Sequence, residues 1–171
     1  MIKVYSRAHE VVDRYKDSKW LEVFTENEDT TKHYYYEFFS DDVPIGLWRL
    51  RHKNTITNFG NSFVYENQRK KGWGNKIFLV TLNIIKKVFP KTTIIYGQVF
   101  MNNSRRIHIL DKHFGIENKY FETEEPNRFG FKESSSEVDD TFKEVLYYDT
   151  IDNLWNRNKK DIDKLKVVYE G

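Results

Sequence analysis

The sequence predicts an α+β fold: a central mixed β-sheet with helices on both faces. Aromatic and β-branched runs with turn residues between them fill residues 34–67, which is typical of an antiparallel meander. A helix-length apolar segment then leads into a nearly continuous apolar run at 92–100, the order expected of a β-α-β crossover. Aromatic residues make up 16% of the 171 residues, so a single domain spanning 1–171 can bury a sizeable core.

The N-terminal half is expected to form a strand, a helical region and a three-stranded meander. Residues 2–6 read as a short strand, and apolar positions between 8 and 24 recur at helical spacing. The runs at 34–40 and 44–52 are joined by Ser-Asp-Asp, which indicates a hairpin. The run at 55–67 extends this hairpin by a third strand.

The C-terminal half is expected to begin with the crossover. The segment 74–89 is apolar nearly all round, as in a helix packed on a sheet, and Pro90 ends it. After the strand at 92–100, a helix spans 104–113, with Gly115 just past its end as a C-cap. Two strands and a terminal helix complete the chain, at 119–131, 141–151 and 152–168. Before that last helix, the expected order is β-α-β-β-β-α-β-α-β-β.

Composition excludes several classes of function. The chain has no cysteine, which rules out disulfides, thiolate zinc sites and a cysteine nucleophile. Its 28 Lys and Arg and 26 Asp and Glu give a net charge of +2, which argues against a general nucleic-acid or membrane-surface binder. No apolar stretch fits a signal peptide or a membrane span, so we expect a cytoplasmic protein. His108 and His113 lie five positions apart, off a common helix face, and we expect no metal site.

The stretch QRKKGWGNK, residues 68–76, lies between the third meander strand and the long apolar helix. The first N–H groups of a helix have no intrahelical partner and carry partial positive charge. Gly72 and Gly74 leave this backbone open to a ligand, and three cations stand beside it. The pattern favours a pyrophosphate cradle, with a basic turn ahead of a helix as the alternative. It is neither a Walker A loop nor a dinucleotide fingerprint, because Gly-Lys-Ser/Thr is missing and a meander precedes it.

The same residues resemble the GNAT superfamily of acetyl-CoA-dependent N-acetyltransferases. Arg69-x-x-Gly72-x-Gly74 matches its Arg/Gln-x-x-Gly-x-Gly/Ala signature. Val99 to Asn103 then opens a helix whose Ile109-Leu-Asp-Lys112 is similar to the Val-Leu-Glu-Lys of the branch that acetylates ribosomal proteins and polyamines. Two further landmarks resemble the superfamily pattern. Gly46 stands where the superfamily has its Ile-Gly, and the run 145–155 is similar to the closing strand of that branch. The resemblance covers about residues 34–155 and implies a topology that agrees with the order derived above.

The resemblance implies direct transfer of an acetyl group from acetyl-CoA to a primary amine, without an acyl-enzyme. The backbone of Val64 would pair with the pantetheine arm, Asn103 would bond the arm near the thioester, and Lys112 would reach a CoA phosphate. The implied cofactor-binding residues are Val64, Arg69, Lys70, Lys71, Gly72, Trp73, Gly74, Asn75, Asn103 and Lys112.

Two carboxylates are candidates for the general base. Glu66 is the first, because it ends the strand that would carry the thioester; the alternative is a solvated strand-end residue. Glu37 is the second, because flanking Tyr and Phe could desolvate it; the alternative is an outward-facing strand residue.

The chain departs from the superfamily pattern at two informative positions. Lys70 stands where a Gly is usual, and the usual general-acid Tyr falls at Leu110, so the acid is unassigned. Three other tyrosines could replace it, although core packing is the competing role for each: Tyr96, Tyr147 and Tyr148.

The resemblance implies an amine acceptor: a small amine, a polyamine or a protein N-terminus. Two other functions stay open. The departures suit an inactive GNAT-like protein that binds CoA or a partner, and the basic helix around Arg105 and Arg106 could meet the phosphates of tRNA or another nucleic acid. The weak net charge and the acidic stretches ENED and ETEE argue against nucleic acid. A homodimer is implied only by analogy of fold.

Overall fold

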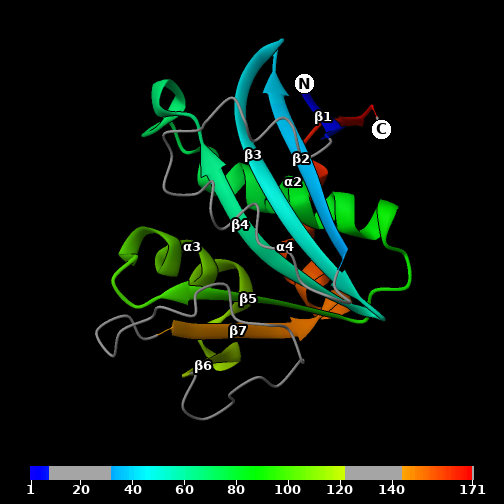
Figure 1. Ribbon diagram of the computed structural model, residues 1–171. Coiled ribbons are helices and arrows are strands. Elements are labelled where there is room, and N and C mark those ends of the chain that lie inside the picture. The colour runs from blue at the N-terminus through cyan, green and yellow to red at the C-terminus, as the bar shows by residue number, and fades with distance from the viewer. Residues whose placement is uncertain (8–31, 122–143, 171) are drawn as a thin grey trace.

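The computed structural model describes residues 1–7, 32–121 and 144–170 (Figure 1). They form an eight-stranded mixed sheet in the order β6-β7-β5-β4-β3-β2-β1-β8, which confirms the predicted fold class. The strands are β1 (Ile2–Arg7), β2 (Lys32–Ser40), β3 (Val43–Lys53), β4 (Ile56–Val64), β5 (Ile94–Phe100), β6 (Lys119–Phe121), β7 (Glu144–Thr150) and β8 (Val167–Tyr169). The helices of the described ranges are α2 (Trp73–Val88), α3 (Ser104–Phe114) and α4 (Ile151–Asp163), with 3-10 turns η2 (Glu66–Gln68) and η3 (Ile116–Asn118).

The meander of β2, β3 and β4 forms as predicted. The β2–β3 turn consists of Asp41 and Asp42, whose φ angles of 48° and 66° are both left-handed. A two-residue hairpin turn with this backbone twist matches the twist of its strands, and aspartate tolerates the left-handed region better than most residues do. The sequence Ser-Asp-Asp therefore folds into the hairpin that it indicated.

The predicted β-α-β crossover joins β4 to β5 through α2. The two strands pair in parallel from Ile56 opposite Ile94 to Phe59 opposite Gly97. Beyond that point β4 continues along β3, and β5 continues along β7. The strands therefore diverge toward their C-terminal ends, as Figure 1 shows. This divergence opens the sheet next to the start of α2.

The three described helices pack against one another on one face of the sheet. Their common core is aromatic: Phe59 of β4 stacks on Phe78 of α2 at 4.6 Å between ring centres, and Phe114 of α3 meets Phe78 edge-on at 5.7 Å. These contacts pack the second turn of α2 and the C-terminal end of α3 against Phe59, where the pairing of β4 with β5 ends. The helical region expected at 8–24 lies outside the described residues.

The C-terminal segment differs from the prediction. The expected helix at 152–168 ends at Asp163, and residues 167–169 instead form β8, which pairs in parallel with β1. An edge strand of three residues depends on the hydrogen bonds to its neighbouring strand. For β8 that neighbour is β1, at the other end of the chain. The local pattern of Val167 and Val168 could not show this pairing.

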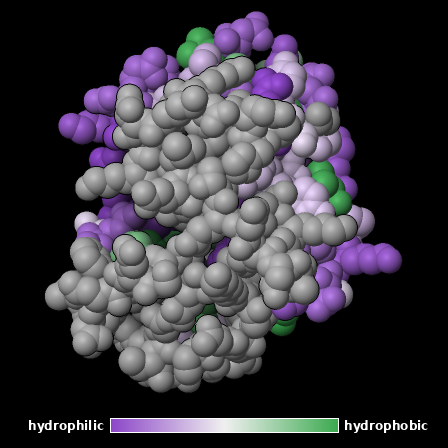
Figure 2. All heavy atoms as spheres, viewed as in Figure 1, coloured by the Kyte–Doolittle hydropathy of each residue, from purple (hydrophilic) through white to green (hydrophobic). Residues whose placement is uncertain are grey.

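The outer surface of the described residues is mainly hydrophilic where Figure 2 shows it. Of the large hydrophobic side chains in the described ranges, those that are exposed come from scattered positions: Met1, Val43, Met101, Ile116 and Val168. None of the helices in the described part of the chain combines the length and the apolar character that crossing a membrane requires.

Candidate functional site

A cleft of about 580 Å³ opens where β4 and β5 diverge, between the N-terminal ends of α2 and α3. We call it the splay cleft. Seven of the ten predicted cofactor-binding residues line it: Val64, Arg69, Lys70, Gly72, Trp73, Gly74 and Asn75. Five more lining residues were not predicted: Gln68, Ser104, Arg105, His108 and Ile109.

The unpredicted residues come mainly from α3. Positions 104, 105, 108 and 109 share one helix face, because residues four apart in a helix lie above one another. The helix itself was predicted correctly, but its orientation depends on packing against Phe59 and Phe78. A helical-wheel argument anchored on the buried Leu110 and Phe114 could have singled out this face.

The start of α2 presents its backbone to the splay cleft. Gly72 is the N-cap residue, with a φ of 78°, and among the described residues no side chain caps the first turn. The N–H groups of that turn are therefore available to an anion, and the dipole of a 16-residue helix adds partial positive charge. A Cβ on Gly74 would lie 2.8 Å from Cδ1 of Ile109, so this second glycine also lets α3 approach α2.

Lys70 holds a left-handed conformation, with a φ of 63°. The superfamily's usual glycine would adopt this conformation without steric cost, whereas a side chain costs about 1–2 kcal/mol. We therefore expect Lys70→Gly to raise the free energy of unfolding by about 0.5–1 kcal/mol, because the greater freedom of glycine in the unfolded chain offsets part of the gain. Denaturant unfolding measures this change.

Lys70→Ala is the matched control, because it removes the same charge and keeps the left-handed strain. If both variants change stability equally, the backbone at position 70 is not strained in the native protein.

Arg69 turns back onto the end of β4. Its Nε donates to the carbonyl oxygen of Val64 at 3.0 Å, and its guanidinium lies 5.1 Å from the ring centre of Phe63. The side chain therefore holds the loop against the strand while its charge stays exposed at the cleft. The Val64 carbonyl accepts this bond, although the resemblance implied that the Val64 backbone pairs with a ligand.

Three predicted cofactor-binding residues stand outside the lining set. Lys71 and Lys112 are exposed. Asn103 is the N-cap of α3, and its Oδ1 accepts from the backbone N–H of Arg106 at 3.2 Å. The structure thus gives the Asn103 side chain a capping role at the edge of the cleft.

The two candidate bases occupy contrasting positions. Glu66 is exposed in η2, directly after β4. Glu37 is fully buried on β2, where it accepts from the hydroxyl of Tyr65 at 2.7 Å and from Nε of Arg7 at 3.0 Å. The alternative interpretation of Glu37 as an outward-facing residue is wrong, because β1 and β3 flank it and Arg7 and Tyr65 hold its carboxylate. Neither glutamate belongs to the residues that line the splay cleft.

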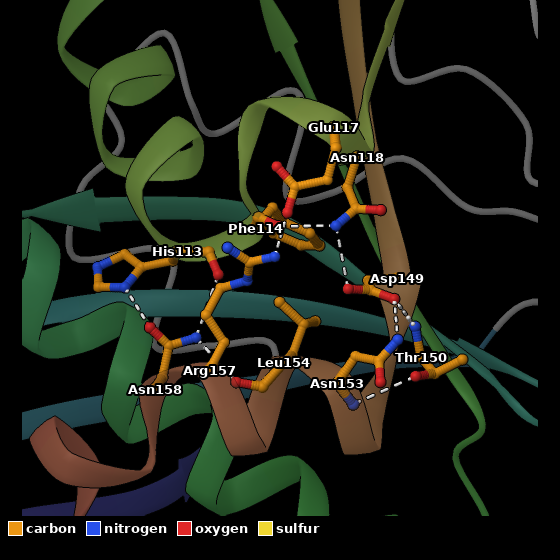
Figure 3. Close-up of polar contacts among 10 residues, drawn as sticks. All are labelled: His113, Phe114, Glu117, Asn118, Asp149, Thr150, Asn153, Leu154, Arg157 and Asn158. Carbon is orange, nitrogen blue, oxygen red and sulfur yellow. Dashed lines mark hydrogen bonds and ion pairs between the residues drawn. The ribbon is translucent and has the colours of Figure 1, made fainter.

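His113 links the three helices through a buried polar network, and Figure 3 shows its contact with Asn158 of α4. Its Nδ1 lies 2.8 Å from Oδ1 of Asn158 on α4, and its Nε2 lies 3.0 Å from Oδ1 of Asn75 at the start of α2. The Asn158 amide donates to the carbonyl oxygens of His113 and Leu154, which fixes its oxygen toward the imidazole. His113 is 1% exposed, whereas His108 is exposed at the cleft.

Burial lowers the pKa of His113, although the hydrogen bond between its ring and Oδ1 of Asn158 opposes the shift. The unfolded chain consequently binds a proton more readily than the native protein, and stability must fall as the pH drops below the ordinary histidine pKa of about 6.5. Comparing wild type with His113→Gln between pH 7 and pH 5, we expect the wild type to lose on the order of 1 kcal/mol more. Urea unfolding at each pH measures the difference, and parallel curves would contradict it.

The three tyrosines that could replace the missing general acid are not among the residues that line the splay cleft. The hydroxyl of Tyr147 donates to Oδ1 of Asp111 at 2.5 Å, and burial is the main cause of its raised pKa. Tyr96 is buried, and Tyr148 stacks on Tyr120 at 4.4 Å. None of the three belongs to the lining set of the splay cleft, and Leu110 is buried in the core.

Comparisons with known proteins support this geometry at the level of fold. No protein-family model matches the sequence, and no curated protein resembles it in sequence. A mutant spermidine/spermine N-acetyltransferase SpeG from Vibrio cholerae superposes with a TM-score of 0.62 at 13% identity, over 92% of this chain and 99% of its own. An IAA acetyltransferase from Bacillus cereus gives 0.58 at 11%, over 88% and 99%.

A third solved structure is an acetyltransferase from Bacillus subtilis in complex with CoA, with a TM-score of 0.54 at 16% identity, over 86% of this chain and 97% of its own. At these identities the likeness shows the fold. The chain thus has the GNAT acetyltransferase fold, as the sequence landmarks implied.

Proposed function

We propose that the protein is an N-acetyltransferase that moves an acetyl group from acetyl-CoA to a primary amine. The observation that carries the proposal is the splay cleft, where an uncapped helix start, a left-handed glycine and basic side chains meet beside a diverging pair of strands. The GNAT fold supports it, and so does the CoA bound to one protein of that fold.

The cleft suits a ligand with a pyrophosphate and a narrow arm. The first N–H groups of α2 would hold the pyrophosphate, as helix starts do in many phosphate sites. Arg69, Lys70 and Arg105 line the same cleft and would add full charges. The opening between β4 and β5 would receive the arm, since these two strands no longer pair with each other there, while β5 stays paired with β7.

Catalysis would rest on position and proton removal. Holding the thioester against the amine supplies much of the rate, and a general base completes the attack by taking the amine proton. Glu66 is the base we propose, because it is accessible directly after the strand that borders the cleft. Its solvated position suits exchange of the proton with water.

The acceptor we propose is a small amine or polyamine, with a protein N-terminus as the other amine of this class. SpeG from Vibrio cholerae is described as a spermidine/spermine N-acetyltransferase and shares this fold. Charge supports the choice only weakly, because the protein's net charge is near zero.

Calorimetric titration with acetyl-CoA, followed by a panel of amines with CoA release as the readout, tests the proposal. We expect saturable binding and turnover with at least one amine. Lack of binding would overturn the acetyl-CoA assignment. Binding without turnover on any amine would favour the inactive, CoA-binding alternative.

A further inference from the structure

Both ring nitrogens of His113 face amide oxygens. Nδ1 lies 2.8 Å from Oδ1 of Asn158, and Nε2 lies 3.0 Å from Oδ1 of Asn75. The Asn158 amide is held in this direction, because its Nδ2 donates to the carbonyl oxygens of His113 and Leu154. Nδ1 must therefore carry a proton and donate to Asn158. Since Nε2 also needs a proton to donate to an oxygen, this arrangement of atoms is that of the imidazolium cation.

The surroundings of the ring give this cation little support. The side chain is 1% exposed, and from α2 the ring meets only uncharged groups among its described contacts: Asn75, and Phe78 stacked at 4.6 Å between ring centres. A buried charge without a paired anion is costly. The cation therefore needs negative charge from elsewhere.

The charged groups around the ring pull in both directions. Burial is the main cause of the lowered pKa of His113, and the cations Lys112 and Arg106 of its own helix add to the effect. The hydrogen bond with Asn158 and the carboxylate of Asp161 on α4 oppose it. Because the net direction is downward, we expect a neutral ring at neutral pH while the cleft is empty.

A neutral ring reverses the hydrogen bond to Asn75. Nδ1 keeps its proton for Asn158, so Nε2 becomes an acceptor and Nδ2 of Asn75 must donate to it. Turning the amide about its Cβ–Cγ bond achieves this, because that torsion is broad and nearly two-fold. The protonation state of His113 thus decides which end of the Asn75 amide faces away from the ring.

Asn75 lines the splay cleft and belongs to the first turn of α2. The N–H groups of that turn would hold the pyrophosphate. A protonated ring leaves the N–H donors of the Asn75 amide to an anion, whereas a neutral ring takes one of them and leaves the amide oxygen. An anion in the cleft therefore favours the protonated ring, and by linkage the protonated ring favours the anion to the same extent.

We propose that His113 is a positioning residue that sets the direction of the Asn75 amide, and that it takes up a proton when the splay cleft binds the phosphates of CoA. The inference rests on the proposed acetyl-CoA site. The proton comes from solvent and binds Nε2, which then donates to Oδ1 of Asn75, and no other covalent bond changes. His113 acts through Asn75 and is not itself among the residues that line the cleft.

NMR of protein labelled with ¹⁵N in its histidine rings measures this protonation directly. Wild type is titrated from pH 8 to pH 5 without ligand and with saturating CoA, and His113→Gln identifies the signal. We expect the Nδ1–H tautomer in the unliganded protein at neutral pH. With CoA bound, the pKa of His113 should rise by about one unit or more, which corresponds to about tenfold tighter binding by the protonated protein.

Titration calorimetry in buffers of different ionisation enthalpy supplies a second readout. Wild type should take up more protons on binding CoA than His113→Gln does. The 3′-phosphate of CoA also titrates near pH 6, but it does so with both proteins, so the difference between them isolates His113.

Two further variants test the path through Asn75. Asn75→Leu keeps the size of the side chain but has no polar atom, and we expect it to abolish the rise in the pKa of His113. His108→Gln removes the other imidazole of α3, which lines the cleft, and we expect it to preserve the rise.

Each result assigns the failure to one step. Lack of CoA binding by wild type would overturn the proposed function. Binding while the pKa of His113 stays unchanged or falls, or while the ring stays neutral throughout the titration, would overturn the role of His113 and leave the CoA site in place. A rise that Asn75→Leu retains would overturn the path through Asn75. If His113→Gln does not fold, the contact of the ring with Phe78 identifies the signal in wild type.

Discussion

Replacing Gly72 with Asp is expected to abolish acetyl-CoA binding. The residue is the N-cap of α2 and lines the splay cleft, where the first N–H groups of the helix would hold the pyrophosphate. A carboxylate there would face the phosphate charges at a few ångströms. Such repulsion is on the order of 3–4 kcal/mol near a protein surface, enough to weaken binding by at least about 100-fold.

Thermal unfolding with and without acetyl-CoA measures this loss. A ligand at 100 times its Kd stabilises the native state by about 2.7 kcal/mol, and this increment should vanish in Gly72→Asp. A Cβ at position 72 meets no atom within 4 Å, so the variant should fold, with a cost of about 1–2 kcal/mol for its left-handed backbone.

Gly72→Asn separates charge from backbone strain. Asparagine has nearly the same shape as aspartate and tolerates the left-handed region, but it carries no charge. We expect Gly72→Asn to keep most of the ligand-induced increase in Tm. Equal losses in both variants would mean that the side chain itself blocks the site, and an undiminished increase in Gly72→Asp would mean that the phosphates bind elsewhere.

The part of the site that could be predicted from sequence is the part that is contiguous in sequence. The cations and glycines of residues 68–76 are neighbours in sequence. At the N-terminus of a helix, such a segment places its backbone N–H groups and its charges around a single anion site. The meander, the crossover and α3 also follow from local patterns, because their apolar periodicity and turn residues agree with the final packing.

Residues that act through distant partners were not predictable in the same way. The ring nitrogens of the buried His113 lie 2.8 Å from Oδ1 of Asn158 and 3.0 Å from Oδ1 of Asn75, residues that are distant from it in sequence. Arg106 was considered only as part of a basic helix that could meet phosphates, because nothing near it in sequence reveals the Trp48 ring, which lies 4.7 Å from its guanidinium carbon. Hydrophobic pattern specifies which face of an element is buried, but polar partners inside a core depend on the three-dimensional arrangement of elements.

Replacing Glu37 with Gln is expected to destabilise the protein by about 2–3 kcal/mol. The carboxylate is fully buried and accepts from Arg7 and Tyr65, so glutamine would leave the Arg7 charge without its anion. Loss of one member of a fully buried pair costs about 3–5 kcal/mol, and we expect a smaller cost here because the Arg7 side chain is 32% exposed. Thermal and denaturant unfolding should show a decrease in Tm of roughly 4–12 °C.

The matched variant Glu66→Gln distinguishes structural from catalytic carboxylates. Glu66 is exposed, so its replacement should leave Tm unchanged. If Glu66 is the general base, kcat/KM should fall by about 100-fold and the acidic limb of its pH profile should disappear. If Glu37→Gln were stable but inactive and Glu66→Gln stayed active, Glu37 would be the general base and Glu66 would not. That outcome is the less expected one, because the buried Glu37 carboxylate already accepts hydrogen bonds from Arg7 and Tyr65 and does not line the splay cleft.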